Sequence, residues 1–386
     1  MEECRKIIVV GDLHIDNRKY SIKNSETFDE VFRLFNQITY LVLENKAEFV
    51  VFLGDIFDSP ENISTNAISV ITMLFKNLSE LTRIIILAGN HDSMDDTYQN
   101  IDLTEGKNES IRSSLVYPFS MSSEIFVADK PLVSDLDQFG TNLPKIQMSF
   151  IPYQTDIVKS LDYIIPKLRD GYAHIMFGHF ETSDMNYIKI LKDKGLVENV
   201  PSAEDLFSKY KQDLVFLGHV HERSEITIND KKLIYTGSAR NINYNNKEEE
   251  KGIYILNIDT LESEFVKNDN TAIYKIFRNA EDFDKYLAET DDEKLAKTKV
   301  KFIYTDSKET VRYNEYKKKL RRLEFEKSIF VSDNNSEEVA NTIILDELKM
   351  ENLMNKDNLF NFILNFKNIP EEERLSYLEI LKKMEG

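Results

Sequence analysis

Five short motifs of this chain carry residue types that bind metal ions, and each motif directly follows an apolar segment. Five of the six histidines lie within these motifs, a placement that random scatter does not explain. Buried imidazole and carboxylate groups need partners or metal ions, and this mixture suits manganese, iron or zinc better than calcium. The motifs therefore predict a divalent metal centre. They are Gly11-Asp12-Leu13-His14, Gly54-Asp55-Ile56-Phe57-Asp58, Gly89-Asn90-His91-Asp92, Gly178-His179-Phe180-Glu181 and Gly218-His219-Val220-His221.

Alternating strands and helices are needed to bring together motifs that lie so far apart in the sequence. Short apolar runs predict strands over 5–12, 48–55 and 83–92. Apolar residues at helical spacing predict helices over 25–45 and 63–81. This alternation is typical of a buried, largely parallel sheet, and ligand sites form at the carboxyl ends of the strands of such a sheet. We therefore expect the motifs to meet along one edge of one sheet.

The spacing within two motifs predicts how their side chains point. Asp12 and His14 are two residues apart, as are His219 and His221, so each pair faces one side if the backbone is extended. The sixth histidine, His174, lies inside a predicted strand, and we expect it to be packed in the core.

Further strands and one interrupted helix are predicted up to about residue 260. Asn229 and Asp230 are turn residues and predict a hairpin over 224–237. Pro166 interrupts a helical pattern over 156–169, so that helix ends early or bends. The other predicted strands cover 145–153, 173–177, 213–217, 251–259 and 263–269.

The composition is that of a soluble globular protein with two or three domains. Of the 386 residues, 41% are hydrophobic and 30% are charged. Cys4 is the only cysteine, which excludes a disulfide framework and a cysteine-built zinc module. No run approaches the ~18 apolar residues of a membrane helix, and the N-terminus shows no signal-peptide pattern. We therefore expect a cytoplasmic protein.

The formal net charge of −18 argues against a simple nucleic-acid coat. It does not exclude an enzyme that acts on nucleic acid, because bound metal ions and a local basic face offset a global deficit of positive charge.

Composition changes after about residue 268 and predicts two further segments. Residues 269–332 alternate strand and helix patterns, which indicates a small α+β domain. Residues 333–338 suit a linker, and residues 337–386 have a polar, wholly helical pattern with apolar residues at helical spacing. That apolar stripe suits docking on a partner helix or packing on the tail's own domain. We therefore divide the chain into 1–268, 269–332 and 333–386.

The second segment contains a basic helix. Residues 301–330 hold nine Lys and Arg against five Asp and Glu, so this stretch is locally basic in an acidic chain. Such a helix suits contact with DNA phosphates, although a solvated helix face explains it equally well. Its basic residues are Lys317, Lys318, Lys319, Arg321 and Arg322.

The five motifs, in this order, resemble those of the calcineurin-like metallophosphoesterases over residues 5 to about 260. The resemblance implies an α/β fold whose core is a β-sandwich flanked by helices. It also implies that Asp55 bridges two metal ions. One ion would be held by Asp12, His14 and His221, and the other by Asn90, His179 and His219.

The same resemblance implies how such a site works. Two metal ions ~3.5–4 Å apart clamp a phosphodiester, activate a water molecule and stabilise the attacking and leaving oxygens. His91 matches the histidine of the family that protonates the leaving oxygen, and Asp58 matches the aspartate that orients it in related phosphatases. Asp16 and Asp92 are interpreted as loop or capping carboxylates.

The residues within the motifs differ between branches of this superfamily. Protein phosphatases carry an arginine after their second motif, and GDIFDSP in this chain lacks it. The motifs resemble instead the DNA double-strand-break repair nucleases, such as bacterial SbcD and the recombination endonuclease subunit of T-even-like phages. The form GHFE and the segment Tyr235-Thr236-Gly237-Ser238-Ala239-Arg240 are most similar to the phage group. Arg240 is interpreted as a contact to DNA phosphate or as a surface arginine.

This branch implies a manganese-dependent nuclease, with magnesium as the second choice of metal. It implies 3′→5′ exonuclease activity on duplex ends and endonuclease activity on single strands or hairpins. It further implies a homodimer formed through early helices such as 25–45, a DNA-binding capping domain, and a helical tail that binds an SMC-like ABC ATPase.

Two alternatives of other classes remain. A stand-alone phosphodiesterase of small molecules or nucleotides suits the acidic charge but leaves the long C-terminal extension unexplained. A metal-free scaffold on the same fold is disfavoured because all seven implied ligands are present.

Overall fold

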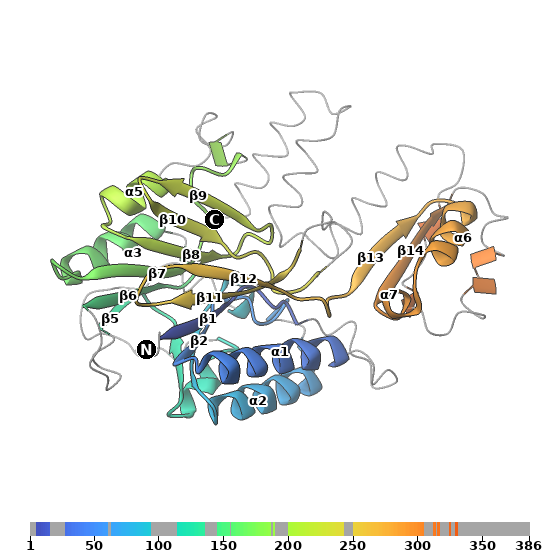
Figure 1. Ribbon diagram of the computed structural model, residues 1–386, viewed down its shortest axis with the longest axis horizontal. Helices are drawn as coiled ribbons and strands as arrows, with labels where there is room; N and C mark the ends of the chain where they lie inside the picture. The colour runs from blue at the N-terminus through green and yellow to red at the C-terminus, as the bar shows by residue number, and fades with distance from the viewer. Residues whose placement is uncertain are drawn as a thin grey trace. The chain divides into compact units, whose positions relative to one another are not determined.

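The computed structural model forms two compact units (Figure 1). The chain passes from the first unit to the second for the last time between Thr271 and Ala272. The predicted helical tail 333–386, the basic side chains 317–322 and Asp16 lie outside the described residues. The structure describes residues 5–15, 28–60, 63–93, 114–135, 145–154, 156–186, 188–189, 200–242, 250–304, 312–313, 315–316, 324–325 and 329–330.

The first sheet of the first unit has the strand order β12-β11-β1-β2-β3-β4. Strands β1 to β4 are parallel to one another, whereas β11 runs antiparallel to β1 and β12 antiparallel to β11. Helices α1 (Asp29–Asn45) and α2 (Thr65–Ser79) cover its outer face (Figure 1). The strands are β1 (Lys6–Val10), β2 (Phe49–Phe52), β3 (Arg83–Leu87), β4 (Ile125–Ala128), β11 (Gly252–Asn257) and β12 (Ser263–Lys267).

The second sheet has the order β5-β6-β7-β8-β10-β9. Helices α3 (Ile157–Ile164) and α5 (Ala203–Ser208) pack on its outer face. Pro166 lies in the short 3₁₀ helix η6 (Ile165–Lys167), so the predicted early end of that helix is confirmed. The strands are β5 (Leu132–Asp135), β6 (Ile146–Ile151), β7 (Ala173–His179), β8 (Leu214–Gly218), β9 (Ser224–Ile228) and β10 (Lys231–Tyr235).

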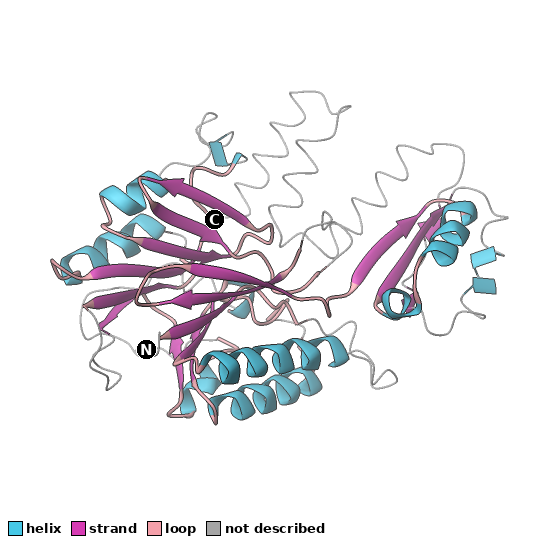
Figure 2. Ribbon diagram, viewed as in Figure 1, coloured by secondary structure: helices cyan, strands magenta, loops and turns pink. Residues whose placement is uncertain are grey.

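The two sheets face each other and form a sandwich with helices on both outer faces (Figure 2). Successive residues of β1 point to opposite faces of the first sheet. Val9 lies in the core between the sheets, while Ile8 and Val10 pack against the helices of the outer face. Phe150, Phe177 and Phe216 stack along the inner face of the second sheet. The expected α/β sandwich flanked by helices is therefore confirmed.

The expectation of a single parallel sheet is wrong. The strands that carry the first three motifs lie in one sheet, and β7 and β8 lie in the other. The hairpin of β9 and β10 is confirmed, and its turn residues Asn229 and Asp230 have φ values of 49° and 65°. Strands β4 and β5, helix α5, and the 3₁₀ helices η2 (Asn90–Asp92) and η4 (Tyr117–Met121) were not predicted.

The second unit contains a small parallel sheet with helices. Phe277, Phe283, Val300, Phe302 and Tyr313 form its apolar core. The strand–helix–strand beginning agrees with the sequence pattern, whereas the short helix α7 was not expected. Its elements are β13 (Ile273–Phe277), α6 (Ala280–Glu289), α7 (Asp292–Ala296), β14 (Thr298–Tyr304), β15 (Glu324–Phe325) and β16 (Ile329–Phe330). Among the described helices of the whole chain, none has the length and apolarity of a membrane span.

Candidate metal centre

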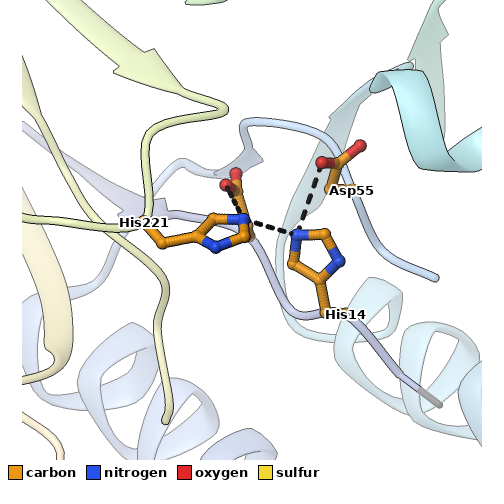
Figure 3. Close-up of side chains that lie close together, drawn as sticks. His14, Asp55 and His221 are labelled. Atoms are coloured by element: carbon orange, nitrogen blue, oxygen red, sulfur yellow. Dashed lines mark hydrogen bonds and ion pairs between the residues drawn. The ribbon is translucent and has the colours of Figure 1, made fainter. Parts of the chain in front are cut away.

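The five motifs meet at the strand ends of the sandwich, where side chains from both sheets converge. A first cluster joins Asp12, His14, Asp55 and His221, whose ligand atoms all lie within 4.8 Å of one another. Nε2 of His14 lies 2.9 Å from Nε2 of His221 and 3.4 Å from Oδ2 of Asp55 (Figure 3). Oδ2 of Asp12 lies 3.7 Å from Nε2 of His221.

A second cluster joins Asp55, His179 and His219. Oδ2 of Asp55 lies 3.3 Å from Nε2 of His179. Oδ1 of Asn90 lies 3.0 Å from Nε2 of His179 and 3.0 Å from Nδ1 of His219. Because Asp55 belongs to both clusters, its carboxylate is placed to bridge them. The structure thus brings all seven expected ligands together in the two expected sets.

These residues fit a pair of divalent cations. Asp12, Asp55 and His179 are at most 1% exposed, and buried carboxylates are costly without a partner. Oδ2 of Asp12 is buried and accepts no hydrogen bond from the described residues. Two imidazole nitrogens that face each other at 2.9 Å share at most one proton, and a cation between them would use both lone pairs.

Three of the clustered residues have an unusual backbone. His14, Asp55 and His219 have φ values of 44°, 47° and 74°, in the left-handed region that costs free energy for residues other than glycine. The prediction that each pair, Asp12 with His14 and His219 with His221, points to one side assumed an extended backbone, and this assumption is wrong. Consequently His219 and His221 turn to different clusters.

Glycines let the chain approach the bridging carboxylate closely. A Cβ atom on Gly89 would overlap Oδ1 and the backbone nitrogen of Asp55. Gly54 has a φ of 109°, and a Cβ there would lie 2.6 Å from Nδ1 of His179.

We predict that Gly89→Ala disables the centre by displacing Asp55. A shift of about 1 Å in a catalytic group costs ~10²-fold in rate, so phosphodiester cleavage should fall at least that far. Cleavage assays and Mn²⁺ titrations check this. Gly171→Ala is the control, since Gly171 has no atom within 4 Å of its Cβ position, although its φ of 79° is positive. It should lose ~1–2 kcal/mol of stability and keep its activity. Equal activity of both variants would contradict the prediction.

Polar contacts behind two histidines set which nitrogen faces the cluster. Nδ1 of His179 donates to the carbonyl oxygen of Leu53 at 2.7 Å, which leaves Nε2 free as a ligand. Nδ1 of His14 lies 3.4 Å from Oδ1 of Asp58, which likewise leaves Nε2 for the cluster.

His91 lies beside the first cluster and is 9% exposed. Its backbone N–H donates to Oδ1 of Asp55 at 2.9 Å, and its ring packs edge-on against His14. Its Nδ1 lies 2.6 Å from the backbone carbonyl oxygen of Asp58. Asp58 therefore contacts His91 through its backbone carbonyl, while its carboxylate faces His14. Burial lowers the pKa of His91.

The residues of the first cluster differ widely in pKa when no cation is bound. Burial lowers the pKa of His14, but the carboxylates of Asp58, Asp55 and Asp12 outweigh it and raise that pKa to about 9. Burial and the nearby His14 hold the pKa of His221 well below its usual range. Burial raises the pKa of Asp12. His14 therefore donates to His221 in the metal-free protein at neutral pH.

We predict that Mn²⁺ binding strengthens as pH rises, because the ion must displace the His14 proton. With a pKa of about 9, His14 is mostly protonated at pH 7, and one displaced proton makes affinity rise ~10-fold per pH unit below that pKa. Calorimetry at pH 7 and pH 8 in two buffers checks both affinity and proton release. In Asp58→Asn the steep range should move to lower pH, and a pH-independent wild-type affinity would contradict the prediction.

Arg240 does not face solvent, and its expected contact with DNA is wrong. It is 3% exposed. Its Nε donates to the carbonyl oxygen of Leu13 at 2.8 Å, and its Nη2 donates to that of His14 at 2.6 Å. Its Nη1 faces the carboxylate of Glu30 on α1 at 3.4 Å. The guanidinium thus holds the loop of the first motif, and its other expected interpretation as a surface arginine is also wrong.

Two other polar residues have structural roles that agree with the expectations. Asp92 accepts hydrogen bonds from the backbone N–H groups of Gly89 and Phe57, as a capping carboxylate does. Burial, with the nearby Asp55, raises the pKa of Asp92 to about 7. His174 is 5% exposed, and its ring nitrogens lie against two backbone carbonyl oxygens, so it is packed in the core.

Sequence reasoning assigned no role to three residues around this centre. Lys251 is buried and donates to the carbonyl oxygen of His221 at 2.7 Å. The ring of Tyr153 lies beside those of His179 and His219. Glu181 contacts His219. The position of Glu181 in the motif GHFE could have indicated a role at the site. Lys251 and Tyr153 lie outside the five motifs, so the sequence provides no such indication for them.

This fold and this pair of clusters define a metal-dependent phosphoesterase. The sequence profile of the calcineurin-like phosphoesterases matches residues 5–223, more than half of the chain. The chain belongs to this family.

Three curated relatives share 22–23% identity with the chain. The DNA double-strand break repair protein Mre11 of Methanococcus maripaludis is 23% identical, with 99% of each chain covered. The SbcD subunit of the nuclease SbcCD from Staphylococcus epidermidis is 22% identical, with 66% of each chain covered. Exonuclease subunit 1 of Enterobacteria phage T4 is 23% identical, and the match covers 56% of this chain and 55% of the phage protein.

Proposed function

We propose that the chain is a manganese-dependent DNA nuclease, a 3′→5′ exonuclease on duplex ends and an endonuclease on single strands or hairpins. The observation that carries this proposal is the double cluster around Asp55 with His91 beside it. The names of the three relatives, all DNA repair proteins or nucleases, support DNA as the substrate.

In this proposal seven residues hold two Mn²⁺ ions, with Mg²⁺ as the second choice. Asp12, His14 and His221 would hold one ion, Asn90, His179 and His219 the other, and Asp55 both. When bound, such a pair supplies Lewis-acid activation of the phosphodiester and a nucleophile at neutral pH.

His91 would be the proton donor to the leaving oxygen. Its Nδ1 donates to the carbonyl oxygen of Asp58, so its Nε2 is the nitrogen that exchanges the proton. Its backbone N–H holds Oδ1 of Asp55 at 2.9 Å, which fixes the ring next to the bridging carboxylate. Asp58 would position both His91 and His14.

We further propose that the chain works as the nuclease subunit of a complex with an SMC-like ATPase, in the cytoplasm of a bacterium or a phage-infected cell. Residues 269–332 would cap the DNA, with the basic residues at 317–322 on the phosphates, and 333–386 would bind the ATPase. Two copies would associate through early helices such as α1. The match to the archaeal relative over 99% of both chains supports a shared organisation.

The direct test is digestion of end-labelled duplex DNA by the purified protein with Mn²⁺. We expect shortening from the 3′ ends that EDTA abolishes. If DNA stays intact when the ATPase partner and ATP are also supplied, while bis(p-nitrophenyl) phosphate is cleaved, the protein is the small-molecule phosphodiesterase that its net charge of −18 favours. Inactivity on both substrates would overturn the proposal.

A further inference from the structure

His219 is held from both ends of its ring. Nδ1 lies 3.0 Å from Oδ1 of Asn90, on the side of the second cluster. Nε2 lies 2.9 Å from Oε2 of Glu181, on the opposite side. The ring of Tyr153 covers one face, with centroids 5.7 Å apart and planes tilted by 33°. His219 therefore has a fixed orientation as well as a fixed position.

The Glu181 carboxylate decides which His219 nitrogen carries the proton. A carboxylate accepts, so it selects the tautomer with hydrogen on Nε2 and leaves the Nδ1 lone pair facing Asn90 and the cluster. His219 has a left-handed backbone, with a φ of 74°, and its Nδ1 rather than its Nε2 lies against Asn90.

The residues that follow Glu181 are held in place by hydrogen bonds. The next residue, Thr182, is buried, and its backbone N–H donates to the hydroxyl of Tyr235 at 2.8 Å. The Tyr235 hydroxyl also donates to Oγ1 of Thr182 at 3.1 Å, and Tyr235 is fully buried on β10. The backbone N–H of Ser183 donates to the carbonyl oxygen of Pro201 at 2.8 Å. These bonds hold Glu181 against His219, although its side chain is 24% exposed.

We propose that Glu181 is a positioning residue for the second metal ion, which acts by fixing the orientation and tautomer of His219. This inference rests on the proposed two-ion site and assigns to Glu181 the part that Asp58 plays for His14 in the first cluster. Each cluster then contains one histidine backed by a carboxylate. Loss of such a partner typically lowers metal affinity ~10–100-fold, and here the loss is confined to one of two ions.

The test counts bound ions rather than activity. Titration calorimetry and Mn²⁺ electron paramagnetic resonance would compare the wild type with Glu181→Ala, Glu181→Gln and Glu204→Gln. Glu204 is the matched control, an exposed glutamate on α5. We expect the wild type and Glu204→Gln to bind two ions and show a spin-coupled Mn²⁺ pair. Glu181→Ala should bind the second ion ~10–100-fold more weakly and show an uncoupled six-line signal at intermediate Mn²⁺. Glu181→Gln, which keeps an acceptor oxygen, should fall between them.

The outcomes separate this inference from the proposed function. Two ions of wild-type affinity in Glu181→Ala would overturn the role of Glu181 and leave the nuclease proposal intact. Fewer than two ions in the wild type would overturn the two-ion site itself. The melting temperature without metal should match the wild type in both Glu181 variants, since the partly exposed carboxylate contributes to metal binding more than to folding. If Glu181→Ala fails to fold, Glu181→Gln decides the question with the same readouts.

Discussion

Asp55→Asn is expected to lose both metal ions and to reduce DNA cleavage by at least ~10³-fold, which corresponds to ~4 kcal/mol of transition-state stabilisation. Asp55 is the one residue shared by both clusters. Its Oδ2 lies 3.4 Å from Nε2 of His14 and 3.3 Å from Nε2 of His179. An amide in its place carries no charge and cannot bridge two cations.

The electrostatics of the site agree with this expectation. Burial alone would raise the pKa of Asp55, but His179, His91 and His14 outweigh it and hold that pKa well below its usual range. The carboxylate is therefore charged at all working pH values and is ready to bind cations. No other described residue lies in both clusters, so no neighbour replaces it.

The fold should survive the substitution, so the loss can be assigned to metal binding. The amide oxygen of an asparagine can still accept the backbone N–H of His91, as Oδ1 of Asp55 does at 2.9 Å. Asp213→Asn is the control, because Asp213 also accepts a backbone N–H, from His174 at 3.0 Å, and lies outside both clusters. Mn²⁺ titration and cleavage of end-labelled DNA are the measurements. Cleavage by Asp55→Asn within tenfold of the control would contradict the bridging role.

The location of the metal centre could be predicted because its ligands follow strands that are largely apolar. Strands β2 (FVVF) and β8 (LVFLG), which precede Asp55 and His219, are buried at every position, and such runs are visible in the sequence. The division of the strands between two sheets could not be predicted, because a short apolar run does not indicate which other strand it pairs with. Strands β4 (IFVA) and β5 (LVSD) have only four residues each and show no sustained periodicity.

The contacts around the ligands could not be predicted, because they depend on backbone atoms that are distant in the sequence. Arg240 is enclosed only because carbonyl oxygens of Leu13 and His14, more than 220 residues away along the chain, lie in reach of its guanidinium. Composition favours an exposed arginine, and tertiary structure overrides it. Asp58 is similar: the motif indicated that it lies close to His91, but only the folded structure shows that its backbone carbonyl makes the contact.

His91→Asn is expected to bind two Mn²⁺ ions as the wild type does and to cleave DNA ~10²–10⁴-fold more slowly, the usual contribution of a positioned proton donor. His91 is not a member of either cluster, so its loss leaves all seven proposed ligands in place. Its backbone N–H, which holds Asp55, is retained in the variant. This separation of binding from rate is opposite to the effect of Asp55→Asn.

The leaving group provides the decisive control for His91. The deoxyribose oxygen released from DNA needs a proton, whereas p-nitrophenolate leaves without one. His91→Asn should therefore lose much less activity on bis(p-nitrophenyl) phosphate than on DNA, and wild-type and variant rates on both substrates measure the difference. An equal loss on the two substrates would show that the His91 side chain acts at a step other than protonation of the leaving oxygen, since the backbone N–H that holds Asp55 is still present in the variant. Retention of full activity on DNA would remove His91 from the mechanism altogether.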